Sequence, residues 1–172
     1  MTEWKSCLVL GGARSGKSTY AEDLALRCGL SPVYIATSQA FDGEMDDRIA
    51  LHRERRGAEW NLSEEPLDLI KVIRENDQST KVVLVDCLTL WLSNLMHAER
   101  NVDLEVQRLC EMLSTLSAKI LFVSNEVGLG IVPENTLARH FRDHQGRLNQ
   151  SIAAAVDRVD FIAAGLPLTL KP

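Results

Sequence analysis

The segment at residues 11–18 constrains the fold of this chain more than any other, because it reads Gly-Gly-Ala-Arg-Ser-Gly-Lys-Ser and matches G-x-x-x-x-G-K-[ST] in full. It follows an apolar run at residues 7–10 and precedes a segment of helical period at residues 19–27, the strand–loop–helix context that this motif requires. Glycines let backbone N–H groups turn inward around phosphate oxygens, and the N-terminus of the following helix favours their negative charge. The sequence therefore predicts a nucleotide phosphate site formed by Gly11, Gly12, Ala13, Arg14, Ser15, Gly16, Lys17 and Ser18. We expect Lys17 to face solvent until it reaches the outer phosphates, and the Ser18 hydroxyl to join a Mg²⁺ shell.

Four short apolar runs indicate a parallel sheet. They are continuous rather than alternating, which is typical of strands that are covered on both faces. These runs lie at residues 7–10, 33–36, 82–85 and 120–123. Segments of helical period separate or follow them, at residues 19–27, 42–56, 66–74, 102–116 and 134–156. The tail at residues 161–170 predicts two short edge strands around a turn. The pattern predicts one α/β domain over residues 1–172, similar to P-loop NTPases, with a mostly parallel sheet and helices on both faces.

Length and charge exclude several classes of protein. The chain has 172 residues, close to one domain at a prior of about 150 residues per domain. A net charge of −5 argues against a protein that binds nucleic acid backbones. No apolar run approaches the roughly 18 residues that a membrane span needs, and the first residues lack a secretory signal, so we expect a cytoplasmic protein. The four cysteines are scattered, which favours core positions over a zinc site or disulfides.

Polar residues follow two of the expected strands. Asp86 comes directly after residues 82–85, and an acid at the end of a strand that neighbours the phosphate loop can hold Mg²⁺, directly or through water. The alternative is an ordinary cap at the end of a strand; the complete phosphate loop favours the metal role. Asn125 and Glu126 follow another strand and precede a glycine-rich segment, where open α/β sheets bind ligands. That segment could equally be a tight connection.

Histidines occur in two further patterns. At helical spacing, Arg48, His52 and Arg56 share one face of the segment at residues 42–56. Acids between them allow a solvated helix with ion pairs, and the residues alone favour that interpretation. His140 and His144 also stand four residues apart, but neighbouring arginines and the lack of a clear third ligand favour a structural or substrate-contacting role over a metal site.

Five blocks of sequence together resemble one family. They lie at residues 11–18, 34–39, 86–89, 125–133, and 139–143 with 146–150. In this order they are similar to the bifunctional adenosylcobinamide kinase / adenosylcobinamide-phosphate guanylyltransferase family of cobalamin biosynthesis, over nearly the whole chain. The phosphate loop is shared by many families, whereas the Asn-Glu-Val-Gly block at 125–128 and the Arg-His-Phe-Arg-Asp block at 139–143 are specific to this one.

The resemblance implies a second reaction and a set of residues. In this family a histidine, here His52 in Arg-Ile-Ala-Leu-His, attacks the α-phosphorus of GTP and carries GMP covalently. Neighbouring arginines would keep the imidazole neutral and stabilise charge on the phosphoryl group. The implied nucleotide-binding residues outside the phosphate loop are Ala36, Thr37, Ser38, Arg53, Glu54, Arg55, Arg56, Glu64 and Asp86, with Glu64 in a loop after Trp60. Ser18 and Asp86 would hold Mg²⁺, the substrates would be GTP, ATP and a corrinoid, and the chain would form a homotrimer.

Two other functions remain open at the level of sequence. A simple small-molecule kinase would use the same loop without a guanylyl intermediate, and His52 would then be a surface histidine. A nucleotide-dependent binding protein acting on nucleic acid or a partner is disfavoured by the acidic charge balance. A guanine-reading Asn-Lys-x-Asp motif is absent, which argues against a GTPase switch.

Overall fold

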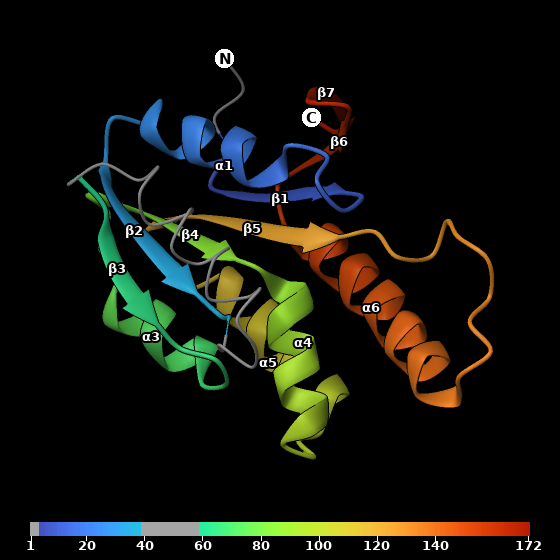
Figure 1. The fold of residues 1–172 in the computed structure, drawn as a ribbon. Coiled ribbons are helices and arrows are strands. Elements are labelled where there is room, and N and C mark those ends of the chain that lie inside the picture. Colours follow the sequence, from blue (N-terminus) through green and yellow to red (C-terminus); the bar gives the residue numbers. More distant parts are fainter. Residues whose placement is uncertain (1–3, 39–58) are drawn as a thin grey trace.

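The computed structural model describes residues 4–38 and 59–172, which build one sheet with helices on both faces (Figure 1). Its seven strands run in the order β3-β2-β4-β5-β1-β6-β7. The strands are β1 (Ser6–Gly11), β2 (Ser31–Ala36), β3 (Asn61–Glu64), β4 (Lys81–Asp86), β5 (Lys119–Asn125), β6 (Arg158–Ala163) and β7 (Leu166–Lys171). Neighbouring strands are parallel except β6 and β7, which pair antiparallel. Parallel pairing brings the carboxyl ends of six strands to one edge of the sheet.

The helices divide unequally between the two faces. Side chains of α1 (Lys17–Leu26) pack in one apolar cluster with Val82 and Leu84 of β4. The other cluster holds Val83 and Val85 together with side chains from four helices. These are α3 (Leu69–Glu75), α4 (Leu88–His97), α5 (Val102–Leu113) and α6 (Thr136–Ala155). Successive residues of β4 therefore face opposite layers, and burial on both sides explains why the strand is continuously apolar.

The prediction of a mostly parallel sheet with helices on both faces is confirmed, but two elements were missed. The strand β3 has four residues and an exposed Leu62, so it shows no apolar run. The helix α4 buries six of its ten residues, and an element that is apolar on most sides gives no clear helical period. The helix expected from residue 66 begins at Leu69, because the Glu65 carboxylate accepts the N–H groups of Leu67 and Asp68 in a turn. The helix expected at residues 42–56 lies outside the described residues.

The C-terminal tail forms the expected hairpin, although only one of its strands lies at the edge. We expected two edge strands, but β6 pairs with β1 as well as with β7. Of the two strands, β7 alone lies at an edge of the sheet. The turn between them has positive φ angles at Ala164 and Gly165, which suits the twist of a tight hairpin. Buried Asp160 in β6 accepts hydrogen bonds from Arg158, Thr169 and Tyr20, at 2.8, 2.7 and 3.0 Å. The hairpin is therefore tied to α1 through Tyr20.

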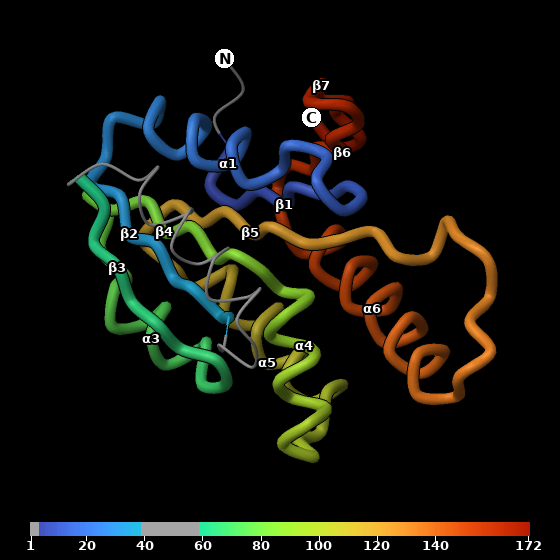
Figure 2. The backbone as a smooth tube through the Cα atoms, in the orientation of Figure 1, coloured from blue at the N-terminus to red at the C-terminus, as the bar shows by residue number. Residues whose placement is uncertain are grey.

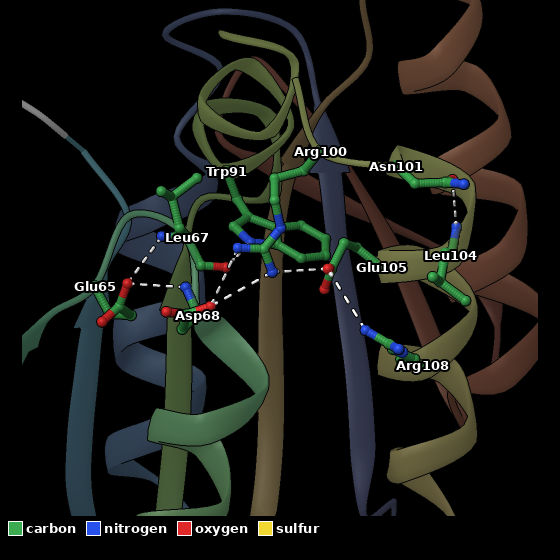
Figure 3. Close-up of polar contacts among 9 residues, drawn as sticks. All are labelled: Glu65, Leu67, Asp68, Trp91, Arg100, Asn101, Leu104, Glu105 and Arg108. Carbon is green, nitrogen blue, oxygen red and sulfur yellow. Dashed lines mark hydrogen bonds and ion pairs between the residues drawn. The ribbon is translucent and has the colours of Figure 1, made fainter. Parts of the chain in front are cut away.

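A polar network joins the helices on the face away from α1 (Figure 3). The indole N–H of buried Trp91 in α4 donates to the Leu67 carbonyl at 2.9 Å. Arg100 donates to Glu105 in α5 at 2.8 Å and approaches Asp68 at 3.5 Å. These bonds fix α4 and α5 against the segment that enters α3.

In the described ranges, none of the helices has the length and apolar character needed to cross a membrane.

Asn94 connects α4 with the loops that follow β2 and β3. Its buried side-chain amide donates to the carbonyl of Thr37 at 2.8 Å and to that of Pro66 at 3.0 Å. Both acceptors belong to segments that leave the carboxyl edge of the sheet. A single side chain on α4 therefore holds two loops at this edge.

We predict that Asn94→Ala lowers the free energy of unfolding by about 2 kcal/mol or more, because it leaves two carbonyls in the interior without their donor. Urea denaturation followed by circular dichroism measures this change. The control is Gln107→Ala, since Gln107 is exposed on α5 and bonds only to Glu111 in the described chain. The control should change stability by no more than about 0.5 kcal/mol. Equal losses in the two variants would contradict the role of Asn94.

Candidate nucleotide-binding site

The phosphate loop connects β1 to α1 and depends on glycine at both of its ends. Gly11 closes β1 with φ +155°, and Gly16 precedes α1 with φ +99°. A Cβ on Gly11 would lie 2.4 Å from the carbonyl oxygen of Ile162, and one on Gly16 would lie 3.2 Å from Cα of Gly165. The residue before α1 is Gly16, which has no side chain to cap the helix, and the N-terminus of a helix favours an anion. The glycines therefore occupy the backbone positions that the predicted phosphate site requires.

The C-terminal hairpin contacts and supports this loop. The N–H of Gly165 in the β6–β7 turn donates to the carbonyl of Ser15 at 2.8 Å. Figure 2 shows the hairpin, in red, beside the blue segment that contains the loop. Ser15 also carries a buried hydroxyl with no hydrogen-bond partner in the described chain. A buried hydroxyl without a partner is costly, so this atom fits a site that is completed by an acceptor such as phosphate.

Lys17 is buried rather than exposed, which corrects the expectation from sequence. Only 7% of its surface is accessible, and its ammonium donates to the Gly12 carbonyl at 2.6 Å. The ammonium is therefore hydrogen-bonded to a backbone carbonyl of the phosphate loop itself. Burial lowers the pKa of Lys17, and the nearby Cys87 and Asp86 oppose that shift. Phosphate oxygens would compete with a single neutral carbonyl for this ammonium.

Asp86 ends β4 on the same edge of the sheet. Its carboxylate Oδ2 accepts the hydroxyl of Tyr34 at 2.7 Å. We expected its strand to neighbour the phosphate-loop strand, but β5 lies between β4 and β1. Lys17 and Asp86 nevertheless lie at the same edge of the sheet, and the negative charge of Asp86 opposes the lowering of the Lys17 pKa.

Residues Ala36, Thr37 and Ser38 lie beside Asp86, at the end of β2. Thr37 is fully buried, and its hydroxyl donates to the Cys87 carbonyl at 2.7 Å and accepts the Cys87 N–H at 3.0 Å. Its own N–H donates to the Asp86 carbonyl at 3.2 Å. Thr37 thus extends the pairing of β2 and β4 past their last residues. Its hydroxyl is engaged by backbone, whereas Ser38 is partly accessible.

The end of β5 joins its own sequence block, residues 125–133, to three others. The N–H of Asn125 donates to the hydroxyl of Thr89 at 2.8 Å, and its carbonyl accepts the amide of Asn149 at 3.0 Å. The N–H of Glu126 donates to the Gly11 carbonyl at 3.0 Å. The Glu126 carboxylate accepts the N–H of Gly128 and closes the turn that follows. Blocks that are far apart in the chain therefore meet beside the phosphate loop.

The remaining expected residues are placed as follows. Glu64 is the last residue of β3, where it pairs with Ala36, and not part of a loop. It is exposed, as are Ala13 and Arg14 in the phosphate loop. His52, Arg53, Glu54, Arg55 and Arg56 lie outside the described residues.

The pair His140 and His144 does not form part of a metal site in the described chain. His140 is exposed, and His144 Nδ1 lies 3.1 Å from Arg147 and 3.8 Å from Asp103. Residues 4–38 and 59–172 contain no group of three His, Cys, Asp or Glu side chains that could hold a metal ion.

Sequence reasoning missed Tyr34, Trp60, Asn94 and Gly165. Tyr34 lies within the sequence block at residues 34–39, but an aromatic residue in an apolar strand gives no sign of a bond to an acid 52 residues away. Trp60 packs on its ring at 5.8 Å with an interplanar angle of 85°. Gly165 gave a turn signal only, and its contact with the phosphate loop depends on the position of the hairpin.

Comparison with known proteins identifies the family. The family model described as cobinamide kinase / cobinamide phosphate guanyltransferase (CobU) matches residues 7–170. The chain belongs to this family. As a member it is a bifunctional enzyme, a cobinamide kinase and a cobinamide phosphate guanylyltransferase.

Relatives of this CobU-family chain match it over nearly their full lengths. The bifunctional adenosylcobalamin biosynthesis protein CobP of Pseudomonas aeruginosa is 51% identical, over 95% of this chain and 96% of the relative. The protein CobU of Salmonella typhimurium is 42% identical, over 95% of this chain and 98% of the relative. The resemblance seen in the sequence is thereby confirmed.

Solved structures share the fold at low identity. The flagellar accessory protein FlaH of Methanocaldococcus jannaschii has a TM-score of 0.54 at 15% identity, covering 97% of this chain and 78% of that one. The RadB recombinase has a TM-score of 0.51 at 16% identity, covering 91% and 73%. These similarities confirm a fold of the P-loop NTPase type.

We predict that Gly11→Ala and Gly12→Ala differ sharply in stability, although the residues are adjacent. The added methyl group at Gly11 meets the Ile162 carbonyl, whereas a Cβ at Gly12 meets nothing within 4 Å. Gly11→Ala should cost about 2 kcal/mol or more, and so lower Tm by about 5 °C or more, while Gly12→Ala should stay within about 2 °C of the wild type. Calorimetric melting curves of the two variants measure this. Similar Tm values would show that the hairpin does not confine the loop at Gly11.

Proposed function

We propose that this chain phosphorylates adenosylcobinamide with ATP or GTP, and then transfers GMP from GTP through a covalent His52–GMP intermediate to give adenosylcobinamide-GDP. The observation that carries the proposal is a complete phosphate loop with Lys17 and Asp86 within electrostatic reach, in a member of the CobU family. The loop suits phosphoryl transfer, and the family supplies the corrinoid substrate and the second reaction.

In the kinase reaction the protein positions the reactants and stabilises charge. The hydroxyl oxygen of the aminopropanol arm attacks the γ-phosphorus, the bond from that phosphorus to the β–γ bridging oxygen breaks, and the hydroxyl proton passes to water. The N–H groups of the loop and of the first turn of α1 would bind the phosphates. The Lys17 ammonium would leave the Gly12 carbonyl for the outer phosphate oxygens. No protein nucleophile is needed for this step.

The residues present fit a magnesium ion bound together with the nucleotide. Mg²⁺ usually takes one or two protein oxygens and completes its shell with phosphate and water, so a dedicated cluster of ligands is not required. Ser18 is the second residue of α1 and follows Lys17. The Asp86 carboxylate lies at the end of β4, and its Oδ1 accepts no hydrogen bond in the described chain. These two side chains would hold the ion, which when bound offsets the negative charge of the phosphates.

The guanylyl transfer proceeds in two displacements. A nitrogen of the neutral His52 imidazole attacks the α-phosphorus of GTP, and pyrophosphate leaves. A phosphate oxygen of adenosylcobinamide phosphate then attacks the same phosphorus, the P–N bond breaks, and the imidazole is restored. Arg53, Arg55 and Arg56 would bind the triphosphate and disfavour the protonated imidazole.

The family resemblance also supports a homotrimer in the cytoplasm. Leu129 and Ile131 follow β5 and are 85% and 98% exposed, which is unusual for large apolar side chains next to a polar site. Analytical ultracentrifugation of the purified chain tests the trimer directly.

We predict that His52→Ala separates the two reactions. Among side chains of residues 42–56, histidine is the one that offers a neutral nucleophilic nitrogen near neutral pH, whereas arginine stays protonated and carboxylates are repelled by phosphate. The variant should lose the acid-labile GMP adduct, and the adenosylcobinamide-GDP product, while it still phosphorylates adenosylcobinamide. Mass spectrometry of the intact protein after incubation with GTP and Mg²⁺ measures the adduct.

The control for this prediction is His140→Ala, because His140 is an exposed histidine on α6. The control should gain the mass of one GMP, as the wild type does. An adduct that persists in His52→Ala would point to another nucleophile. No adduct in the wild type would favour a simple small-molecule kinase.

We predict that Lys17→Ala abolishes both activities with little effect on stability. It removes the ammonium that serves the phosphates, so turnover should fall by about 100-fold or more. Burial lowers the pKa of Lys17, which means that the charged ammonium is costly to keep in the interior. Removing this charge offsets the loss of its hydrogen bond to the Gly12 carbonyl. Steady-state turnover and urea denaturation measure the two effects, with the exposed Lys71→Ala as the control. Near-normal phosphorylation by Lys17→Ala would remove the phosphate loop from the mechanism.

A further inference from the structure

The Asp86 carboxylate is held by a tyrosine from the neighbouring strand. Tyr34 lies in the middle of β2, is only 3% exposed, and donates its hydroxyl to Asp86 Oδ2 at 2.7 Å. In the register of β2 and β4, Ala36 is paired with Asp86, so Tyr34 stands two residues before that pair. Residues two apart in a strand share a face, and the ring therefore runs along the face of the sheet toward the carboxylate.

The ring itself has little freedom to move. Trp60 packs edge-on against it, with 5.8 Å between ring centroids, and the same apolar cluster contains Ala21, Leu84 and Leu121. The backbone of Asp86 is held by the residue that follows the same strand, because the N–H of Thr37 donates to its carbonyl. Both the main chain and the side chain of Asp86 are thus set by β2 and the residue that follows it.

Rotation about the Cβ–Cγ bond of an aspartate exchanges the positions of its two carboxylate oxygens. A strong hydrogen bond to one oxygen restricts this rotation and leaves the other oxygen for a ligand. Tyr34 occupies Oδ2, and Oδ1 accepts no hydrogen bond within the described chain. A bond to an ionised carboxylate is stronger than one between neutral groups and restricts this rotation. Outer-shell bonds of this kind orient ligands and tune their affinity for metal ions.

We propose that Tyr34 is a positioning residue for the metal-binding carboxylate of Asp86, fixing Oδ2 so that Oδ1 serves the magnesium ion that accompanies the nucleotide. This inference rests on the proposed metal role of Asp86. It adds to the site a side chain that acts through Asp86.

The test compares Tyr34→Phe with Tyr20→Phe. These are the two tyrosines of the chain, and each donates its hydroxyl to an aspartate, so the two substitutions remove the same atom and the same kind of bond. Phenylalanine keeps the ring against Trp60. The Mg²⁺ concentration that gives half-maximal kinase activity should rise about 10-fold or more in Tyr34→Phe, the range for losing an outer-shell partner, and stay within about 2-fold in Tyr20→Phe. A readout independent of turnover is Mn²⁺ binding with a non-hydrolysable GTP analogue, followed by electron paramagnetic resonance, and it should show the same difference.

The outcomes separate this inference from the metal role on which it rests. Asp86→Asn should weaken Mn²⁺ binding at least as much as Tyr34→Phe does. If Asp86→Asn weakens it and Tyr34→Phe leaves it at the wild-type value, the positioning role is overturned and the metal role stands. If neither variant changes Mn²⁺ binding, the metal role of Asp86 fails as well.

A measurement on the wild-type sequence covers the case in which Tyr34→Phe does not fold. The chain labelled with 3-fluorotyrosine has two fluorine resonances, which the Tyr20→Phe variant assigns. Adding Mn²⁺ with the GTP analogue should broaden the Tyr34 resonance strongly and the Tyr20 resonance much less. Equal broadening of the two resonances, or none, would overturn the proposal.

Discussion

The phosphate loop keeps its shape because glycine stands where the neighbouring backbone leaves no room for a side chain. At Gly11 a methyl group would collide with the Ile162 carbonyl of β6, and at Gly16 it would press on Gly165 in the hairpin turn. Hydrogen bonds then secure the loop from two directions, from Gly165 to Ser15 and from Glu126 to Gly11. The loop is therefore part of the sheet edge rather than a free connection, and the orientation of its N–H groups is set before a nucleotide arrives. Such preorganisation reduces the entropy lost on binding.

The strand order arranges the rest of the site around that loop. Since β5 lies between β1 and β4, the acid at the end of β4 is separated from the phosphate loop by the width of a strand. The end of β5 therefore lies between Lys17, at the start of the helix that follows β1, and Asp86 at the end of β4. Asn125 at that point is held on one side by Thr89 and on the other by Asn149. The side chains of Thr89 and Asn149 thus bond to the backbone at the end of β5.

The same arrangement explains why blocks specific to the family lie so far apart in the chain. Thr89 belongs to the block that follows Asp86, and Asn149 belongs to α6. Each bonds to the backbone of Asn125, so a change in one block alters the position of the strand end that both support. Asn94 acts in a similar way on the loops after β2 and β3. In this structure, therefore, Thr89 and Asn149 join separate sequence blocks into one hydrogen-bond scaffold at the edge of the sheet.

The sequence by itself determined the phosphate loop, the four central strands and the family, because these depend on local glycine chemistry, on continuous apolar runs and on short motifs. It also marked Asp86 as the acid at the end of β4. It did not reveal β3 or α4, since a short exposed strand and a helix buried on most sides lack the periodic patterns that identify such elements. Tertiary structure alone decided that β5 separates Asp86 from the loop, that Lys17 is buried against Gly12, that Tyr34 bonds to Asp86, and that Gly165 bonds to Ser15. These features depend on strand order and on contacts between residues far apart in the chain, which local sequence patterns do not encode.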